Sequence, residues 1–256
     1  MARNAQARPE QARGCAPCCR RRRRGIGPAR DRTLDAQPVT RLAIFDCDGT
    51  LVDSQANICR AVEEAFAEAR IAVPPRDAIR RIVGLSLVEA MQALLPDASD
   101  ADHRVLAQKY KDKFVAMRAS GALDEEPLFD GVGALVERLA DQGWRLGVAT
   151  GKSDRGLAHV LSTHGLAHHF VTLQTSDRHP SKPHPSMIEV AIAETGADPA
   201  RTAMIGDTTY DVMMAVNAGV RAIGVGWGYH SPDELADAGA HSIALEVADL
   251  PQHLEA

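Results

Sequence analysis

From residue 41 onward the apolar positions alternate between short β-branched runs and longer stretches with helical spacing. The short runs are candidate strands, and they cover residues 42–45, 145–149, 170–173, 202–205, 222–225 and 242–245. Short strands that alternate with longer helices are typical of a parallel sheet covered by helices. We therefore predict an α/β fold with a parallel sheet and helices on both of its faces.

About a hundred residues separate the first two predicted strands, far more than one crossover helix requires. Residues 55–71 carry apolar side chains at three- and four-residue spacing, and Pro74-Pro75 ends that pattern. Further helical patterns cover residues 77–83, 86–95 and 102–118, and a core helix is expected at 132–142. We predict a helical domain at 55–121, inserted into a core made of residues 41–54 and 122–256.

The first forty residues differ in composition from the rest of the chain. Ten Arg face three acidic residues there, a net charge of +7, so the total of −5 leaves −12 for the remainder. The segment shows no strand or helix periodicity and no apolar stretch after its arginines. We predict a disordered basic extension at 1–40 that is not a secretory signal. The acidic remainder makes nucleic acid an unfavourable partner.

The cysteines and the apolar runs indicate the cellular compartment. Cys15 and Cys18 have C-x-x-C spacing, but no second pair or nearby His cluster completes a metal site. Cys47 and Cys59 are too few for a disulfide framework. No apolar run approaches the length that a membrane helix needs. A cytoplasmic protein without a membrane partner is expected.

Polar residues gather where the predicted strands end, which is where ligands bind in open α/β sheets. The first strand runs into Asp46-Cys47-Asp48-Gly49, and the second into Thr150-Gly151-Lys152. Lys182 precedes a helix whose first turn is marked by Pro185. A later strand runs into Gly206-Asp207, and Asp211 follows on the same face of the next helix.

Four carboxylates that converge on one crevice repel one another unless a cation lies among them. Ligand sets made only of oxygen favour Mg²⁺, so we predict a magnesium site. A lysine, a hydroxyl group and glycine amides suit a phosphoryl group. One Asp is then available to attack phosphorus and another to move protons.

The order of these motifs resembles the haloacid dehalogenase superfamily of phosphohydrolases. The motifs are D-x-D-G-T at 46–50, T-G at 150–151, K-P at 182–183 and G-D-x-x-x-D at 206–211. The resemblance extends from residue 41 to about residue 228, and it is closest to the phosphoglycolate phosphatase group. It implies a Rossmann-like core, with residues 55–121 as a small helical cap.

The resemblance also implies a role for each motif residue. Asp46 is expected to attack phosphorus and form an aspartyl-phosphate, and Asp48 to protonate the leaving oxygen and then activate water. The phosphate is expected to bind to Thr150 and Gly151. Backbone N–H groups at Cys47 and Gly49 are further candidates for binding it.

The resemblance also implies roles for the charged residues around Asp46. Lys182 is expected to neutralise charge on Asp46 and on the transferring group. Asp207 is expected to bind Mg²⁺ beside Asp46 and the backbone carbonyl of Asp48, with Asp211 close by. The dehalogenases themselves lack the second acid of the first motif, so Asp48 favours phosphate chemistry.

The expected activity is hydrolysis of a small phosphate monoester such as phosphoglycolate, by a monomer or homodimer. Two alternatives are a phosphomutase of the β-phosphoglucomutase type and a non-catalytic phospho-receiver domain. The predicted cap sets the substrate. Candidates for contacting the substrate are Asp53, Ser54, Arg80, Arg81 and the Gly84-Leu85-Ser86 turn. Either arginine would suit a carboxylate on the substrate.

Overall fold

The structure, a computed structural model, describes residues 40–255. The expectations placed on residues 1–39 therefore lie outside the described residues. Within residues 40–255 no helix has the length and apolar character needed to cross a membrane.

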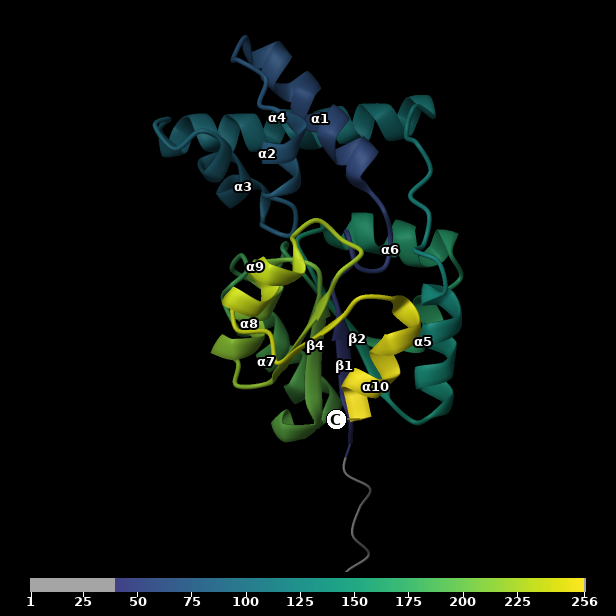
Figure 1. The fold of residues 1–256 in the computed structure, drawn as a ribbon. Coiled ribbons are helices and arrows are strands. Elements are labelled where there is room, and N and C mark those ends of the chain that lie inside the picture. The colour runs from purple at the N-terminus through teal and green to yellow at the C-terminus, as the bar shows by residue number, and fades with distance from the viewer. Residues whose placement is uncertain (1–39, 256) are drawn as a thin grey trace, which may run out of the picture. The chain divides into compact units, whose positions relative to one another are not determined.

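The described core is built on six parallel strands in the spatial order β3-β2-β1-β4-β5-β6 (Figure 1). The strands are β1 (Leu42–Phe45), β2 (Arg145–Thr150), β3 (Phe170–Thr175), β4 (Thr202–Gly206), β5 (Arg221–Val225) and β6 (Ser242–Ala244). Every neighbouring pair is parallel. The predicted α/β fold is confirmed, and each predicted strand lies within two residues of an observed one.

Helices cover both faces of this sheet. They are α5 (Val132–Asp141), α6 (Asp154–Thr163), α7 (Ser186–Thr195), α8 (Thr209–Asn217), α9 (Pro232–Asp237) and α10 (Leu250–Glu255). Side chains alternate along a strand, so Ala43 and Phe45 pack with α5, α6 and α10 while Leu42 and Ile44 pack with α7, α8 and α9. This double burial explains why β1 is apolar at every position.

The interval between β1 and β2 contains helices, as expected. They are α1 (Gln55–Ala69), α2 (Arg76–Arg80), α3 (Leu87–Leu94) and α4 (Asp100–Ser120). Phe66, Ile79, Met91 and Leu106 give these helices an apolar core of their own. Figure 1 shows them gathered at the end of the core to which the carboxyl end of β1 leads.

The boundaries of the inserted helices depend on capping groups. Helix α4 begins two residues before the predicted start, because Ser99 and Asp102 form a capping box at its N-terminus. Helix α1 ends at Ala69, where Arg70 takes a left-handed conformation with φ of 58°. Helix α2 ends at Arg80, three residues earlier than predicted.

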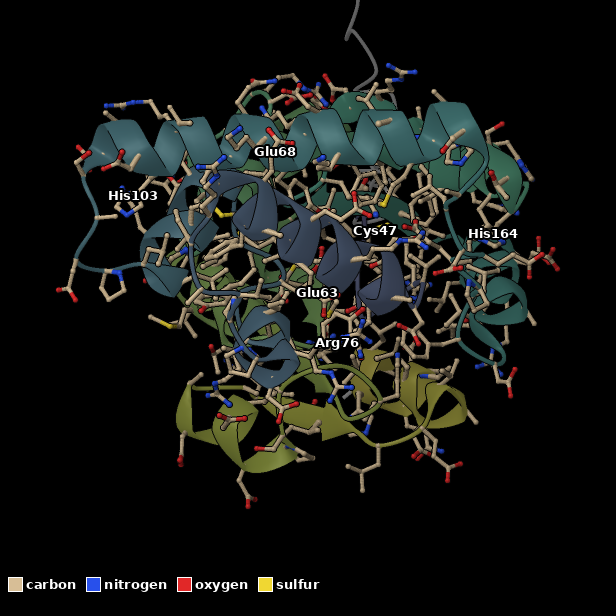
Figure 2. All side chains as sticks on the ribbon, turned by 90° about the horizontal axis from the view of Figure 1, so that it is seen from above. Cys47, Glu63, Glu68, Arg76, His103 and His164 are labelled. Atoms are coloured by element: carbon tan, nitrogen blue, oxygen red, sulfur yellow. The ribbon has the colours of Figure 1, made fainter. Side chains whose placement is uncertain are left out.

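Ion pairs add to the packing among the inserted helices. Glu68 of α1 pairs with Lys109 and Lys113 of α4, and Arg76 lies 2.7 Å from Glu63. Figure 2 views these helices from above, with Glu63, Glu68 and Arg76 labelled. Such exposed pairs are worth about 0–1 kcal/mol each, so the apolar contacts provide most of the stabilisation.

Replacing Phe66 by Ala tests this balance, because its side chain is fully buried among α1–α4. We expect a loss of roughly 3–5 kcal/mol in the free energy of unfolding, measured by urea denaturation. The control is Val105→Ala, since Val105 is 57% exposed on α4. Its effect should stay within about 0.5 kcal/mol, and equal losses in the two variants would contradict the assignment of the core.

Candidate active site

The turn after β1 directs Asp46 and Asp48 away from the strand end. The N–H group of Asp46 still donates to Ile205 O of β4, and the N–H groups of Leu51 and Val52 donate back to Cys47 O. Gly49 has φ of +84°, and a Cβ atom there would lie 2.2 Å from Asp207 Oδ2. Only glycine fits this position without displacing Asp207.

A second turn, between β4 and α8, positions Asp207 and Asp211. Asp211 Oδ2 accepts hydrogen bonds from the hydroxyl and the N–H group of Thr208, at 2.7 and 3.1 Å. The arrangement is a capping box of α8. A Cβ atom on Gly206 would lie 2.3 Å from Asp211 Cγ, so this glycine leaves the room that the carboxylate occupies. The spacing of the motif thus follows from the cap of a helix.

Lys182 connects the two turns. Its Nζ lies 2.9 Å from Asp46 Oδ1 and 2.6 Å from Asp211 Oδ1, and all three side chains are buried. Asp46 Oδ2 is also buried, but it has no hydrogen-bond partner among the described residues. One oxygen of this carboxylate is therefore held in place while the other is left available.

Asp207 completes a group of three acids. Oxygen atoms of Asp46, Asp207 and Asp211 all lie within 4.8 Å of one another. Asp207 Oδ1 accepts from the Thr50 hydroxyl at 2.8 Å, and its Oδ2 accepts from the N–H group of Tyr229 at 2.9 Å. These contacts fix the carboxylate on the same side of the crevice as Asp46.

The charges of the group are not balanced, since one ammonium faces three carboxylates. Burial raises the pKa of Asp46 to about 7, Lys182 opposes that rise, and Asp211 and Asp48 add to it. Burial and the neighbouring acids also raise the pKa of Asp207 well above its usual range. Burial lowers the pKa of Lys182, but Asp211 and Asp46 outweigh that effect and raise it. The excess negative charge of the three carboxylates fits a bound divalent cation.

Asp48 lies in a separate polar cluster. Lys152 Nζ is 2.7 Å from Asp48 Oδ1, which also accepts a hydrogen bond from the hydroxyl of Ser54. Glu126 Oε2 lies 3.5 Å from the same ammonium group. The sequence marked Lys152 only as a cation after a strand, and it gave no signal for Glu126, which follows no motif. Asp48 thus pairs with Lys152, whereas Asp46 pairs with Lys182.

Thr150 and Gly151 lie where the inserted helices meet the core. Thr150 is fully buried, and its hydroxyl accepts from the N–H group of Lys152 at 3.2 Å. A Cβ atom on Gly151 would lie 2.7 Å from Leu85 O and 2.8 Å from Gly84 O. The Gly84-Leu85-Ser86 turn therefore packs against the second motif, and its contact with a substrate stays a prediction.

Two backbone donors proposed for phosphate binding have partners inside the protein. The N–H group of Cys47 donates to Asp46 Oδ1 at 2.6 Å, and that of Gly49 donates to Val52 O at 2.9 Å. Phosphate binding by the N–H groups of Cys47 and Gly49 stays a prediction, and in this structure both donors serve the turn itself. Burial raises the pKa of the Cys47 thiol.

The candidate arginines of the insertion are also engaged elsewhere. Arg81 pairs with Glu234 of α9, and Arg80 lies 3.3 Å from Asp77 in its own helix. Each pair engages one guanidinium nitrogen near the surface, and Arg80 Nε is buried without a partner among the described residues. The structure therefore offers no support for either residue as a binding group for a substrate carboxylate.

Comparisons with known proteins agree with this geometry. Residues 43–225 match the family model described as haloacid dehalogenase-like hydrolase. The chain is 39% identical to a protein of Dickeya dadantii named probable phosphatase IndB, over 76% of this chain and 84% of that one. It is 28% identical to a phosphoglycolate phosphatase of Mannheimia succiniciproducens, over 80% and 94% of the two chains.

Two further matches are informative. A Mycobacterium tuberculosis protein named tyrosine-protein kinase PtkA is 31% identical over 84% of this chain and 72% of its own length. The crystal structure of a predicted phosphatase from Clostridium acetobutylicum superposes with a TM-score of 0.77. The two sequences are 29% identical, and the match covers 85% of this chain and all of that one.

The acidic group predicts how a divalent cation affects stability. In the metal-free protein the pKa of Asp46 lies above its usual 3.8, so ionising it costs stability increasingly between pH 4 and about 7. Mg²⁺ should bind the ionised form, and its affinity should fall by about tenfold per pH unit below 7. Thermal unfolding with and without Mg²⁺ should show a larger rise in Tm at pH 8 than at pH 6. Asp207→Asn should abolish the rise, whereas a rise independent of pH would contradict this account.

Removing the shared ammonium should destabilise the protein. Lys182→Met leaves buried carboxylates without their counter-charge, which we expect to cost roughly 3–5 kcal/mol in metal-free protein. The loss should be larger at pH 8 than at pH 5.5, because protonation removes the repulsion. Urea denaturation measures it. Lys109→Met, which removes a partly exposed cation, should cost less than about 1 kcal/mol. Equal losses at the two pH values would exclude charge as the cause.

Proposed function

The chain belongs to the haloacid dehalogenase-like hydrolases and is a hydrolase of phosphoric monoesters, and from this premise we propose that it acts through an aspartyl-phosphate on Asp46 with Mg²⁺ as cofactor. The observation that best supports the proposal is the state of Asp46. One of its oxygens is held by Lys182 and the other is buried without a partner among the described residues. A nucleophile needs this combination of fixed orientation and a free electron pair.

In the first step Asp46 Oδ2 forms a bond to phosphorus as the bond from phosphorus to the ester oxygen breaks. Asp48 gives a proton to the leaving oxygen, so an alcohol departs. In the second step Asp48 takes a proton from water as the water oxygen forms a bond to phosphorus, the bond from phosphorus to the Asp46 oxygen breaks, and inorganic phosphate leaves the regenerated carboxylate. The different cationic partners of Asp48 and Asp46 support two distinct roles for the two acids.

The remaining motif residues surround the reacting group in this proposal. The Thr150 hydroxyl and the Gly151 backbone bind phosphate oxygens, because both lie at the end of β2, which pairs with β1. Lys182 neutralises charge on Asp46 and on the phosphoryl group. These are contributions to electrostatic stabilisation, which is often the largest single term in catalysis.

Asp46, Asp207 and the backbone carbonyl of Asp48 would hold Mg²⁺, with Asp211 beside them. The cation would supply charge neutralisation for the phosphoryl oxygens. The tight turn around Gly49, which brings Asp207 against the loop after β1, supports this set of ligands.

We further propose that the inserted helices α1–α4 act as a cap that selects a small phosphorylated metabolite. The contact between Gly84-Leu85 and Gly151 supports this, because it places the insertion directly over the phosphate motif. The phosphoglycolate phosphatase among the relatives makes a phosphoglycolate-like ester the first compound to assay. Cys47 and Cys59 are free and buried, in keeping with a cytoplasmic location.

Transfer of the phosphoryl group to an acceptor other than water is the second candidate function. The relative named as a tyrosine-protein kinase favours it, since that name implies phosphoryl transfer to a protein hydroxyl. A phosphomutase would likewise return the group to a sugar. Both alternatives use the same first step and differ from hydrolysis only in the acceptor.

Phosphate release tests the proposal. Purified protein should release inorganic phosphate from a panel of esters in the presence of Mg²⁺ but not after chelation. Asp46→Asn should lower kcat by about 10³-fold or more, and Asp48→Asn by about 10²–10⁴-fold. Asp141→Asn is the control, because Asp141 is an exposed acid at the end of α5, before the start of β2, and its loss should leave kcat within about twofold. Loss of the ester without release of phosphate would instead favour transfer.

A further inference from the structure

A cavity of about 640 Å³ lies between the inserted helices and the core, and it opens onto the candidate active site. Asp48, Gly151 and Lys152 form part of its wall on the side of the core. The Gly84-Leu85-Ser86 turn and Ser181 border it as well. A phosphate held at Thr150 and Gly151 therefore leaves the rest of its ester facing this space.

The opposite walls are largely apolar. They come from three of the inserted helices and from the segment before α3, and include Ile58, Val62, Val83, Leu87, Met91 and Phe114. Ile58, Val62 and Met91 are buried parts of the core of the insertion. Tyr110 stacks near Phe114, with ring centroids 5.6 Å apart. The cavity thus ends in a wall of aliphatic side chains and aromatic rings.

Some charged groups around the cavity pair with one another and others are exposed, while Arg118 Nε is buried without a hydrogen-bond partner among the described residues. Glu126 and Asp48 share Lys152, and the guanidinium group of Arg118 lies over the ring of Phe114 at 5.9 Å. Arg104, Lys111 and Arg155 are exposed. Among the described residues that line the cavity, neither Arg80 nor Arg81 is present.

The size of the cavity argues against a two-carbon substrate. Pockets of about 300–1,000 Å³ usually take ligands with many more heavy atoms than phosphoglycolate has. Removing an apolar wall from water favours binding only when an apolar group of the ligand covers it. A short carboxylate would leave the wall in contact with water. The two arginines that the sequence offered for binding that carboxylate, Arg80 and Arg81, are paired at the surface and are absent from the cavity wall.

We propose that the preferred substrate is a phosphate monoester whose alcohol part carries a large apolar body with a ring. The proposal rests on the phosphatase function proposed above and names its substrate class. The phosphate binds at the strand ends, the ester oxygen faces Asp48, and the ring lies against Phe114 and Met91. Size and apolar character of the leaving alcohol therefore determine kcat/KM.

The test uses primary alkyl phosphates, because their leaving groups are chemically alike and differ mainly in bulk. The series is ethyl phosphate, hexyl phosphate and 2-phenylethyl phosphate, with phosphoglycolate beside them. One methylene in an apolar pocket is worth roughly 10–200-fold in kcat/KM, so 2-phenylethyl phosphate should exceed ethyl phosphate by about tenfold or more. It should also exceed phosphoglycolate.

Two variants link this preference to the cavity. Phe114→Ala should lower the ratio of kcat/KM for 2-phenylethyl phosphate to that for ethyl phosphate by about threefold or more, through KM. Val105→Ala removes an exposed apolar side chain from the same helix outside the cavity, and it should leave the ratio unchanged. Circular dichroism of both variants shows whether the fold is retained.

The outcomes separate this inference from the function on which it depends. Efficient release of phosphate from phosphoglycolate, with no gain from the ring, would overturn the substrate class and leave the phosphatase function standing. Release from none of the esters would overturn both. An unchanged ratio in folded Phe114→Ala would show that the preference arises outside this cavity and would also contradict the proposal.

Discussion

The ammonium group of Lys182, shared between Asp46 and Asp211, is the interaction on which the site depends. Three carboxylates lie within 4.8 Å of one another in a buried crevice, and without a counter-charge their mutual repulsion would oppose folding. A single cation reduces that repulsion without removing it. Burial together with the remaining repulsion raises the pKa of Asp46 and Asp207, and the excess negative charge leaves a position that a divalent cation can fill. Structural stability and affinity for a metal are therefore set by the same imbalance of charge.

The sheet places these groups together. Strand β1 lies between β2 and β4, so the loops after three neighbouring strands meet at one edge. Two glycines then allow the side chains to approach, Gly49 beside Asp207 and Gly206 beside Asp211. The close approach of residues far apart in the chain thus depends on one local property, the absence of a Cβ atom at a turn. This dependence explains why motifs that carry little meaning singly become informative in their order.

Much of this arrangement was predictable from the sequence because its causes are local. Alternation of apolar runs identified the strands, and the acids and glycines at their ends identified the side of the sheet that carries the chemistry. Sequence reasoning did not predict the hydrogen bonds inside the turn, such as the one from the N–H group of Gly49 to Val52 O. It also gave no role to Glu126, because a single acid in a return segment gains its meaning only from the position of Lys152.

The wall of the cavity is the part least accessible to sequence reasoning, for a physical reason. Helical spacing shows that Ile58, Val62 and Met91 face an apolar environment, but it does not distinguish a closed core from the boundary of a cavity. That distinction depends on how closely α1, α3 and α4 pack and on where the Gly84-Leu85-Ser86 turn meets Gly151. The arginines show the same limit in reverse. The charge of Arg80 and Arg81 suggests recognition of a carboxylate. The structure shows that Asp77 and Glu234 form ion pairs with them instead. The chemistry of the reacting phosphate is thus encoded locally, whereas selection of the alcohol is a property of packing between distant helices.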